Sequence, residues 1–171
     1  LEYLQGSDEG NADDIAVGSV LEVVLDEDNQ AVSVTVRNLN AGGGFGGSGE
    51  VTNGTSANTI TEDTEVDSET YTSTGDDENA LRVDGATVTL KDITIEKTAG
   101  SSSNTEDGDF YGLNAGLLVL NGATATITGA TVNTSVTNGN GVFSYGEGTV
   151  VNISDSTIRT TENNSGGIQT T

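Results

Sequence analysis

Four segments of the chain open with the same pattern, a small residue followed by a branched apolar one. The pairs are Ala80 and Leu81, Gly116 and Leu117, Gly141 and Val142, and Gly167 and Ile168, so the copies start 36, 25 and 26 residues apart. In the first three copies a glycine and a short alternating strand follow, at residues 88–90, 125–127 and 151–153. A period near 25 residues, built from strands of three to five residues, predicts a coil of β-strands.

Stacking of the copies places their apolar residues in three internal columns. The columns are Leu81, Leu117, Val142 and Ile168; then Leu90, Ile127 and Ile153; then Ile95, Val132 and Ile158. Apolar residues two apart point to one face of a strand, and one copy alone cannot bury that face. An antiparallel sandwich also has short alternating strands, but it does not explain side chains that recur in register. We therefore predict an all-β chain whose residues 50–171 form a right-handed parallel β-helix with about three full turns.

The first 39 residues follow a different pattern and predict a small β-rich segment, the end of a preceding domain. Strands are expected at 20–25 and 31–37, joined as a hairpin, with Val32, Val34 and Val36 on a buried face. Residues 1–5 predict another strand of a small β-barrel or sheet. The acidic turn 26–29 lacks the glycine and distal glutamate of an EF-hand, so it is interpreted as a hairpin turn. Residues 40–49, which include Phe45, predict a glycine-rich linker.

Composition excludes several classes of function. The chain has five Lys and Arg against 27 Asp and Glu, a net charge of −22, which argues against nucleic acid and anionic membranes as partners. It has no His and no Cys, so His-dependent triads, thiolate metal sites and disulfides are excluded. No apolar run approaches 18 residues, so no membrane insertion is expected in this segment. Because methionine is absent, we expect a mature or excised segment.

Two parts of the β-helix depart from the repeat. Residues 50–79 are rich in Thr, Asp and Glu, and we expect an irregular first turn that caps the coil. The first copy carries about a dozen extra residues near 98–112, which we expect to leave the coil as a loop that could be deleted without loss of the fold. The outward column Arg82, Leu118 and Phe143 is unusually apolar, with Tyr145 nearby, so we expect the loop to fold back over it.

The remaining chemistry belongs to carboxylates and to the aromatic residues near the inserted loop. Candidate ligand-binding residues are Asn104, Glu106, Asp107, Asp109, Phe110, Tyr111 and Tyr145. Candidate calcium ligands are Asp76, Asp77, Glu78, Glu106, Asp107 and Asp109, because calcium prefers oxygen-rich acidic loops. A pair of carboxylates also suits glycoside hydrolysis, but Asp is common in turns for backbone reasons. Solvated acidic turns therefore remain an alternative interpretation.

The segments 75–88 and 148–158 resemble the adhesin-like right-handed β-helix proteins of bacterial cell surfaces, within the pectate-lyase-like superfamily. The resemblance covers about residues 50–171. It implies an extracellular protein of the bacterial cell surface, without catalysis and without a cofactor. Its implied partner is a host or environmental polysaccharide or surface protein. The superfamily also contains polysaccharide lyases, so a lyase or hydrolase that uses the loop carboxylates is the alternative.

Two further expectations concern the faces and the end of the coil. Ice binding uses flat Thr-x-Thr arrays, and Thr87, Thr89, Thr124 and Thr126 fit such an array, but the third copy places Val150 and Asn152 there. Thr also suits exposed strands through propensity alone. The fourth copy stops soon after Gly167 and Ile168, so we expect further copies, or another chain, to cover this end.

Overall fold

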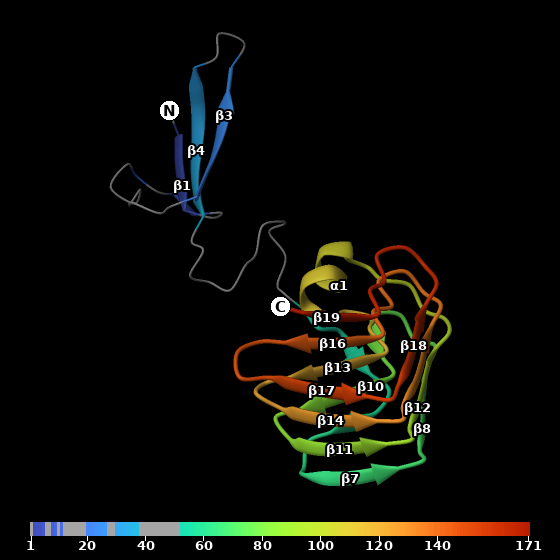
Figure 1. Ribbon diagram of the computed structural model, residues 1–171. Coiled ribbons are helices and arrows are strands. Elements are labelled where there is room, and N and C mark those ends of the chain that lie inside the picture. The colour runs from blue at the N-terminus through green and yellow to red at the C-terminus, as the bar shows by residue number, and fades with distance from the viewer. Residues whose placement is uncertain (1, 6–7, 10, 12–19, 27–29, 38–51) are drawn as a thin grey trace. The chain divides into compact units, whose positions relative to one another are not determined.

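A computed structural model describes residues 2–5, 8–9, 11, 20–26, 30–37 and 52–171. The chain divides into two compact units, Leu1–Gly49 and Glu50–Thr171. The expected linker at 40–49, including Phe45, lies outside the described residues. Each unit is described by itself below (Figure 1).

The first unit contains a four-stranded sheet in the order β2-β1-β4-β3. Its strands are β1 (Glu2–Gln5), β2 (Asp8–Glu9), β3 (Val20–Leu25) and β4 (Ala31–Arg37). β3 and β4 form the predicted antiparallel hairpin, and β1 adds to β4 in parallel, which confirms the strand expected near the start of the chain. At the hairpin turn the Asp26 carboxylate accepts a hydrogen bond from the Gln30 N–H, and Glu27–Asn29 lie outside the described residues.

The buried face expected on β4 is only partly confirmed. Val34 is buried, at a position where β4 is paired on both sides, with β1 and with β3. Val32 is 43% exposed, since the pairing with β1 begins one residue later, at Ser33. The burial of Val36 is not among the described features.

The second unit is a parallel β-helix built from three parallel sheets, whose strands stack from coil to coil (Figure 1). The first sheet contains β6 (Thr59–Ile60), β10 (Leu81–Asp84), β13 (Leu117–Leu120), β16 (Val142–Tyr145) and β19 (Ile168–Thr170). The second contains β7 (Thr64–Asp67), β11 (Thr87–Lys91), β14 (Thr124–Thr128) and β17 (Val150–Ser154). The third contains β8 (Thr70–Ser73), β12 (Thr94–Lys97), β15 (Thr131–Thr134) and β18 (Thr157–Thr160). A short pair, β5 (Thr55–Ser56) and β9 (Glu78–Asn79), precedes the first sheet.

The three predicted internal columns are confirmed by the register of these sheets. In the first column Leu81 pairs with Leu117, and Leu117 pairs with Val142. In the other two columns Leu90 pairs with Ile127, and Ile95 pairs with Val132. These side chains are buried in one continuous core together with the corner alanines. The last coil is less covered, and its Ile168 is 58% exposed.

The segment before the first predicted copy forms a further coil, not the irregular turn expected from the sequence. Ile60, Val66 and Tyr71 lie in register beneath Val83, Leu90 and Ile95 and pack against the core. The opening position of this coil holds Asn58 in place of a leucine. Its amide donates to the Ala80 carbonyl, so a polar residue occupies the place of the apolar marker.

Residues with positive φ turn the corners of the coil. Ser68, Asp92, Gly129 and Asp155 follow the second sheet in successive coils with φ between 49° and 71°. Short polar side chains tolerate this left-handed conformation, and glycine adopts it freely. At Gly129 a Cβ would lie 2.1 Å from the Asp92 Oδ1, so a side chain here would require the Asp92 carboxylate to move.

Candidate functional site

The extra residues of the first regular copy are located where the sequence predicts, but they contain a helix, α1 (Thr105–Tyr111). Asn104 caps its N-terminus, since the side-chain oxygen accepts hydrogen bonds from the N–H groups of Glu106 and Asp107. Gly112 ends the helix with φ of 73°. The loop expected from the sequence is thus corrected to a short capped helix, and Asn104 has a structural role.

α1 and its flanking turns cover the outer face of the first sheet, as the apolar outward column predicts. Leu118 and Phe143 are fully buried in a separate cluster with Ala115 and Leu120. A Cβ at Gly112 would lie 2.7 Å from Leu118 and 3.0 Å from Phe143, so the chain here lies directly on these two side chains.

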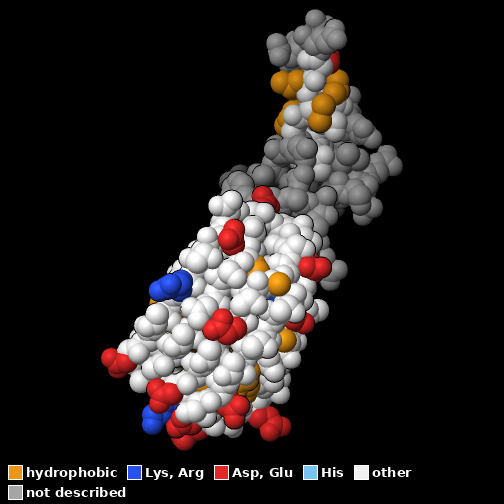
Figure 2. All heavy atoms as spheres, turned by 90° about the vertical axis from the view of Figure 1, so that its right-hand side faces the viewer, with side chains coloured by type: hydrophobic (Ala, Val, Ile, Leu, Met, Phe, Trp, Pro, Cys, Tyr) orange, Lys and Arg blue, Asp and Glu red, His pale blue; other side chains and the backbone are white. Residues whose placement is uncertain are grey.

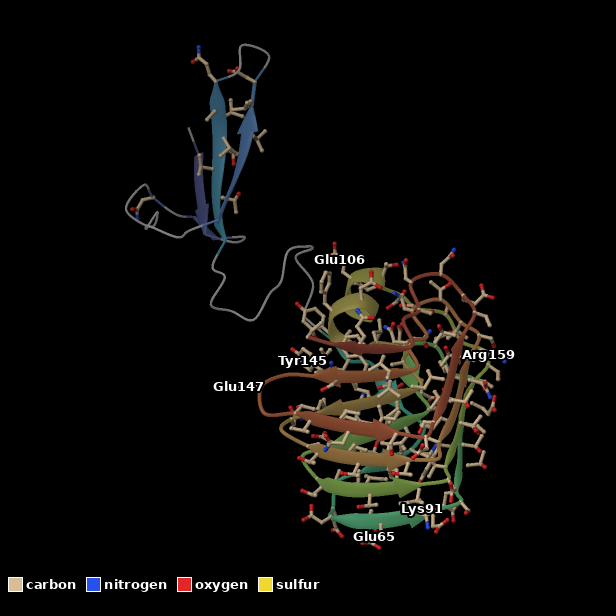
Figure 3. All side chains as sticks on the ribbon, viewed as in Figure 1. Glu65, Lys91, Glu106, Tyr145, Glu147 and Arg159 are labelled. Carbon is tan, nitrogen blue, oxygen red and sulfur yellow. The ribbon has the colours of Figure 1, made fainter. Side chains whose placement is uncertain are left out.

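The aromatic residues of the inserted segment have different environments. Tyr111 packs edge-on against Tyr145, with ring centroids 5.5 Å apart and an interplanar angle of 86°. Tyr145 is the last residue of β16 and is labelled in Figure 3. Phe110 is half exposed, and Glu106 is exposed. Of the candidate ligand-binding residues, these two are therefore the most accessible on α1.

Side chains from successive coils bind the carbonyl groups of the helix and its C-terminus. The donors are Asn140 to the Gly108 O (3.0 Å), Gln169 to Asp109 O (2.6 Å), Thr171 to Phe110 O (2.7 Å), Asn53 to Tyr111 O, and Asn79 to Gly112 O (2.9 Å). The last carbonyls of a helix have no partner within it, so these side chains replace water. The inserted segment is consequently attached to the coil along its length.

The acidic run before the first regular copy is bound to the start of the inserted segment. Asp76 accepts hydrogen bonds from the N–H and hydroxyl of Ser101, which lower the pKa of its carboxyl group. Asp77 accepts a hydrogen bond from the Ser103 N–H. Glu78 accepts one from the hydroxyl of Ser73, which lies in β8 and not in the inserted segment. Within the described residues no three Asp or Glu side chains form a group that could hold a metal ion.

Asp107 and Asp109, the other two candidate aspartates, both lie on α1. Asp109 accepts a hydrogen bond of 2.9 Å from the Asn138 side chain, while burial raises the pKa of its carboxyl group. Asp107 is buried, and desolvation, followed by repulsion from Glu106 and Asp77, raises its pKa. The structure thus gives these two candidate carboxylates distinct environments.

Lys97 is a buried cation that the sequence analysis did not identify. Its ammonium donates to the carbonyls of Gly75 (2.6 Å) and Ala99 (2.8 Å) and to the Ser73 hydroxyl (3.3 Å). Desolvation lowers its pKa, against the attraction of nearby carboxylates led by Glu78. Its position two residues after Ile95, on the inward face, is the only sequence signal of its burial.

The outer faces of the second and third sheets carry rows of hydroxyl and amide side chains. Thr70, Thr94, Thr131 and Thr157 stack in register on the third sheet. On the second sheet Thr89 and Thr126 are flanked by Glu65 and Asn152, so the Thr-x-Thr array is interrupted on both sides. Figure 2 faces the side of the coil on which β8, β12 and β18 lie, and shows a surface that is mostly uncharged, with scattered carboxylates and a few Lys or Arg side chains.

Comparison of the chain with protein-family models, curated proteins and solved structures finds no match. The parallel β-helix therefore stands on its own strand pairing, and the similarity to bacterial adhesins remains a prediction from the sequence. Among the described residues no helix is long and apolar enough to cross a membrane.

Proposed function

We propose that the chain is an extracellular module of a bacterial cell surface that binds a polysaccharide or surface protein, or presents other domains, without catalysis. The observation that carries this proposal is that four of the six candidate carboxylates, those of Asp76, Asp77, Glu78 and Asp109, accept hydrogen bonds within the chain. Asp76, Asp77 and Asp109 each accept hydrogen bonds from neighbouring segments, which orders the inserted segment against the coil. A hydrolase or lyase would instead use such groups on its substrate.

The outer face of the third sheet is the surface that best suits a hydroxyl-rich ligand. Its Thr column presents one hydroxyl per coil, and strands in a sheet are about 4.8 Å apart. In the neighbouring column the Asn133 amide donates to the Glu96 carboxylate, so a donor and an acceptor are already fixed in place. Repeated, pre-ordered polar groups bind a repeating polymer at a low entropic cost.

Binding and turnover on a panel of acidic and neutral polysaccharides test the proposal. We expect binding to some members without release of shorter or unsaturated products. Thr131→Lys should weaken that binding, because it places a long charged side chain at the centre of the Thr column, whereas Thr126→Lys on the second sheet should leave it unchanged. Turnover that is lost in Asp109→Asn would instead establish the alternative, a polysaccharide lyase or hydrolase.

A further inference from the structure

The outer face of the third sheet presents polar side chains in three parallel columns, with one residue of each column per coil. The first column is Thr70, Thr94, Thr131 and Thr157. The second column is Thr72, Glu96, Asn133 and Arg159. The third column is Thr98, Ser135 and Thr161, which follow the strands directly and donate their main-chain N–H groups to the preceding coil. The face therefore repeats a hydroxyl-rich surface from coil to coil along the axis.

This face is accessible and carries little net charge. Three of the four threonines in the first column are exposed. Glu96 and Arg159 are the two charged residues of the three columns, and their charges are opposite. The Asn133 Nδ2 donates to the Glu96 Oε1 (2.8 Å), and Arg159 makes no ion pair within the described part of the chain. Because the net charge of −22 repels polyanions, a neutral polymer rich in hydroxyl groups suits this face best.

The spacing of the coils is a second constraint on such a polymer. Neighbouring strands of a sheet lie about 4.8 Å apart, so the four strands β8, β12, β15 and β18 span about 14 Å. An extended chain of pyranose rings joined by equatorial 1,4 bonds advances by nearly this spacing per sugar. Successive sugars in it are turned over, so their hydroxyl groups point alternately to the two sides, where the first and third columns supply hydroxyl partners. An α-1,4-linked chain coils and loses this match.

We propose that the outer face of the third sheet binds a linear, neutral β-1,4-linked glucan or mannan that runs along the coil axis, with one sugar over each coil. This inference rests on the proposed function, because it specifies the polysaccharide that the Thr column takes. The threonine hydroxyls both donate to and accept from sugar hydroxyls, and the Arg159 guanidinium supplies further donors at the last coil. The three columns contain no aromatic side chain for stacking on a sugar ring. Affinity therefore comes from repeated hydrogen bonds and grows with the length of the glycan.

Titration of the isotopically labelled chain with oligosaccharides, followed through amide chemical shifts, tests the proposal and detects weak binding. Cellohexaose and β-1,4-mannohexaose are the probes, and the tighter of the two identifies glucan or mannan. Maltohexaose is the matched control, since it has the same glucose units as cellohexaose but α-1,4 bonds. We expect shifts in β8, β12, β15 and β18 with the β-1,4-linked probes and none with maltohexaose at the same concentration. From the dimer to the tetramer each added sugar should tighten binding about two- to tenfold, and longer oligomers should add little.

A pair of matched variants locates the contact. Thr131→Val should weaken binding of the preferred hexamer about two- to tenfold, because it removes one hydroxyl but keeps the branched shape and the strand propensity. Thr126→Val makes the same change at an exposed position of the second sheet and should bind as the wild type does. Equal loss in the two variants overturns the assignment to the third sheet.

The other outcomes separate this inference from the proposed function. Equal binding of maltohexaose and the β-1,4-linked hexamers overturns the inference, and so does an affinity that stops rising at two sugars, because neither depends on the coil spacing. If the chain binds another polysaccharide but neither β-1,4-linked hexamer, the inference is wrong and the proposed function stands. If it binds no oligosaccharide and no polysaccharide, the inference and polysaccharide binding are both wrong.

Discussion

Ile127 lies at the centre of the second sheet's internal column, between Leu90 and Ile153, and is 1% exposed. Ile127→Ala should lower the free energy of unfolding by about 2–5 kcal/mol through lost burial and a cavity. Ile127→Asp should cost more, because it buries an unpaired charge. Thr126→Asp is the control, since residue 126 points outward from the same strand and is exposed. Urea unfolding that ranks the control and Ile127→Asp as equally stable would contradict the column assignment.

Lys97 predicts a pH dependence of stability. Its pKa is lowered in the folded state, so with rising pH the folded chain releases this proton before the unfolded chain does. The unfolded chain then binds more protons, and the free energy of unfolding contributed by Lys97 rises with pH in a window below 10.5, by at most about 1.4 kcal/mol per pH unit.

Urea unfolding at a series of pH values from 7 upward, below 10.5, measures this slope. Lys97→Met should lack the rising component. Lys91→Met should retain it, because the Lys91 side chain is exposed beside Asp67. If the free energy of unfolding depends on pH in the same way in the two variants, the pKa of Lys97 does not differ between the folded and the unfolded chain.

Residue types show which positions were predictable. The apolar columns follow from alternation and spacing alone, because apolar side chains at two-residue intervals have one buried face. Lys97 occupies an inward position at the end of the same strand, but lysine is almost never fully buried, so propensity favours the opposite interpretation. Asn114 and Asn138 are also fully buried, and asparagine is mostly exposed in proteins, so no local pattern predicts their burial.

At the scale of elements, α1 tests the role of the inserted segment. Deletion of residues 99–112 would expose Leu118 and Phe143, each of which contributes about 1.5–3 kcal/mol through burial. We now expect the strands to remain, as circular dichroism would show, but with a lower Tm and binding of an apolar dye. This keeps the prediction from the sequence that the segment can be deleted without loss of the fold, and adds a cost in stability.

A second variant tests whether the dye binding of the deletion comes from the exposed apolar face or from a general loss of the fold. The deletion combined with Leu118→Thr and Phe143→Thr should lose the dye binding, because the exposed outer face becomes polar like those of the other two sheets. If the simple deletion keeps the wild-type Tm and binds no dye, α1 does not stabilise the coil.

The sequence located this element and its covering role, but not its helical form. The excess length and the apolar outward column are properties of the repeat, so they are visible by comparison of copies. The helix has seven residues and contains Gly108, too few for a periodic apolar face. Asn104 with acidic residues after it and Gly112 at the other end were the available signals of its two caps.

At the scale of the whole β-helix, the two ends of the coil differ in chemistry. At the first coil, β7 carries Glu65 and Asp67, and charged side chains protect an edge from pairing. Recognition of this coil from the sequence failed because Asn58 replaces the apolar marker. At the last coil, Arg159 is the single charged residue in β17, β18 and β19 (Figure 3).

This asymmetry predicts self-association of the 171-residue chain through its last coil. β17, β18 and β19 each pair on one side only within the described residues, with β14, β15 and β16. Val150 and Ile168 are 43% and 58% exposed there. Unpaired backbone groups beside exposed apolar side chains favour pairing with a second chain. The net charge opposes it, so added salt should strengthen the association.

Sedimentation velocity from micromolar to near-millimolar concentration measures this association. The wild-type chain should show a weight-average mass that rises with concentration, and the double variant Val150→Lys and Ile168→Lys should remain monomeric, because lysines at the edge repel and are costly to bury. Thr64→Lys places a matched charge on β7 at the other end and should associate as the wild type does. If the wild type remains monomeric at high salt, the last coil does not pair with a second chain. If Thr64→Lys is monomeric too, the first coil takes part in the contact, and the chains associate head to tail.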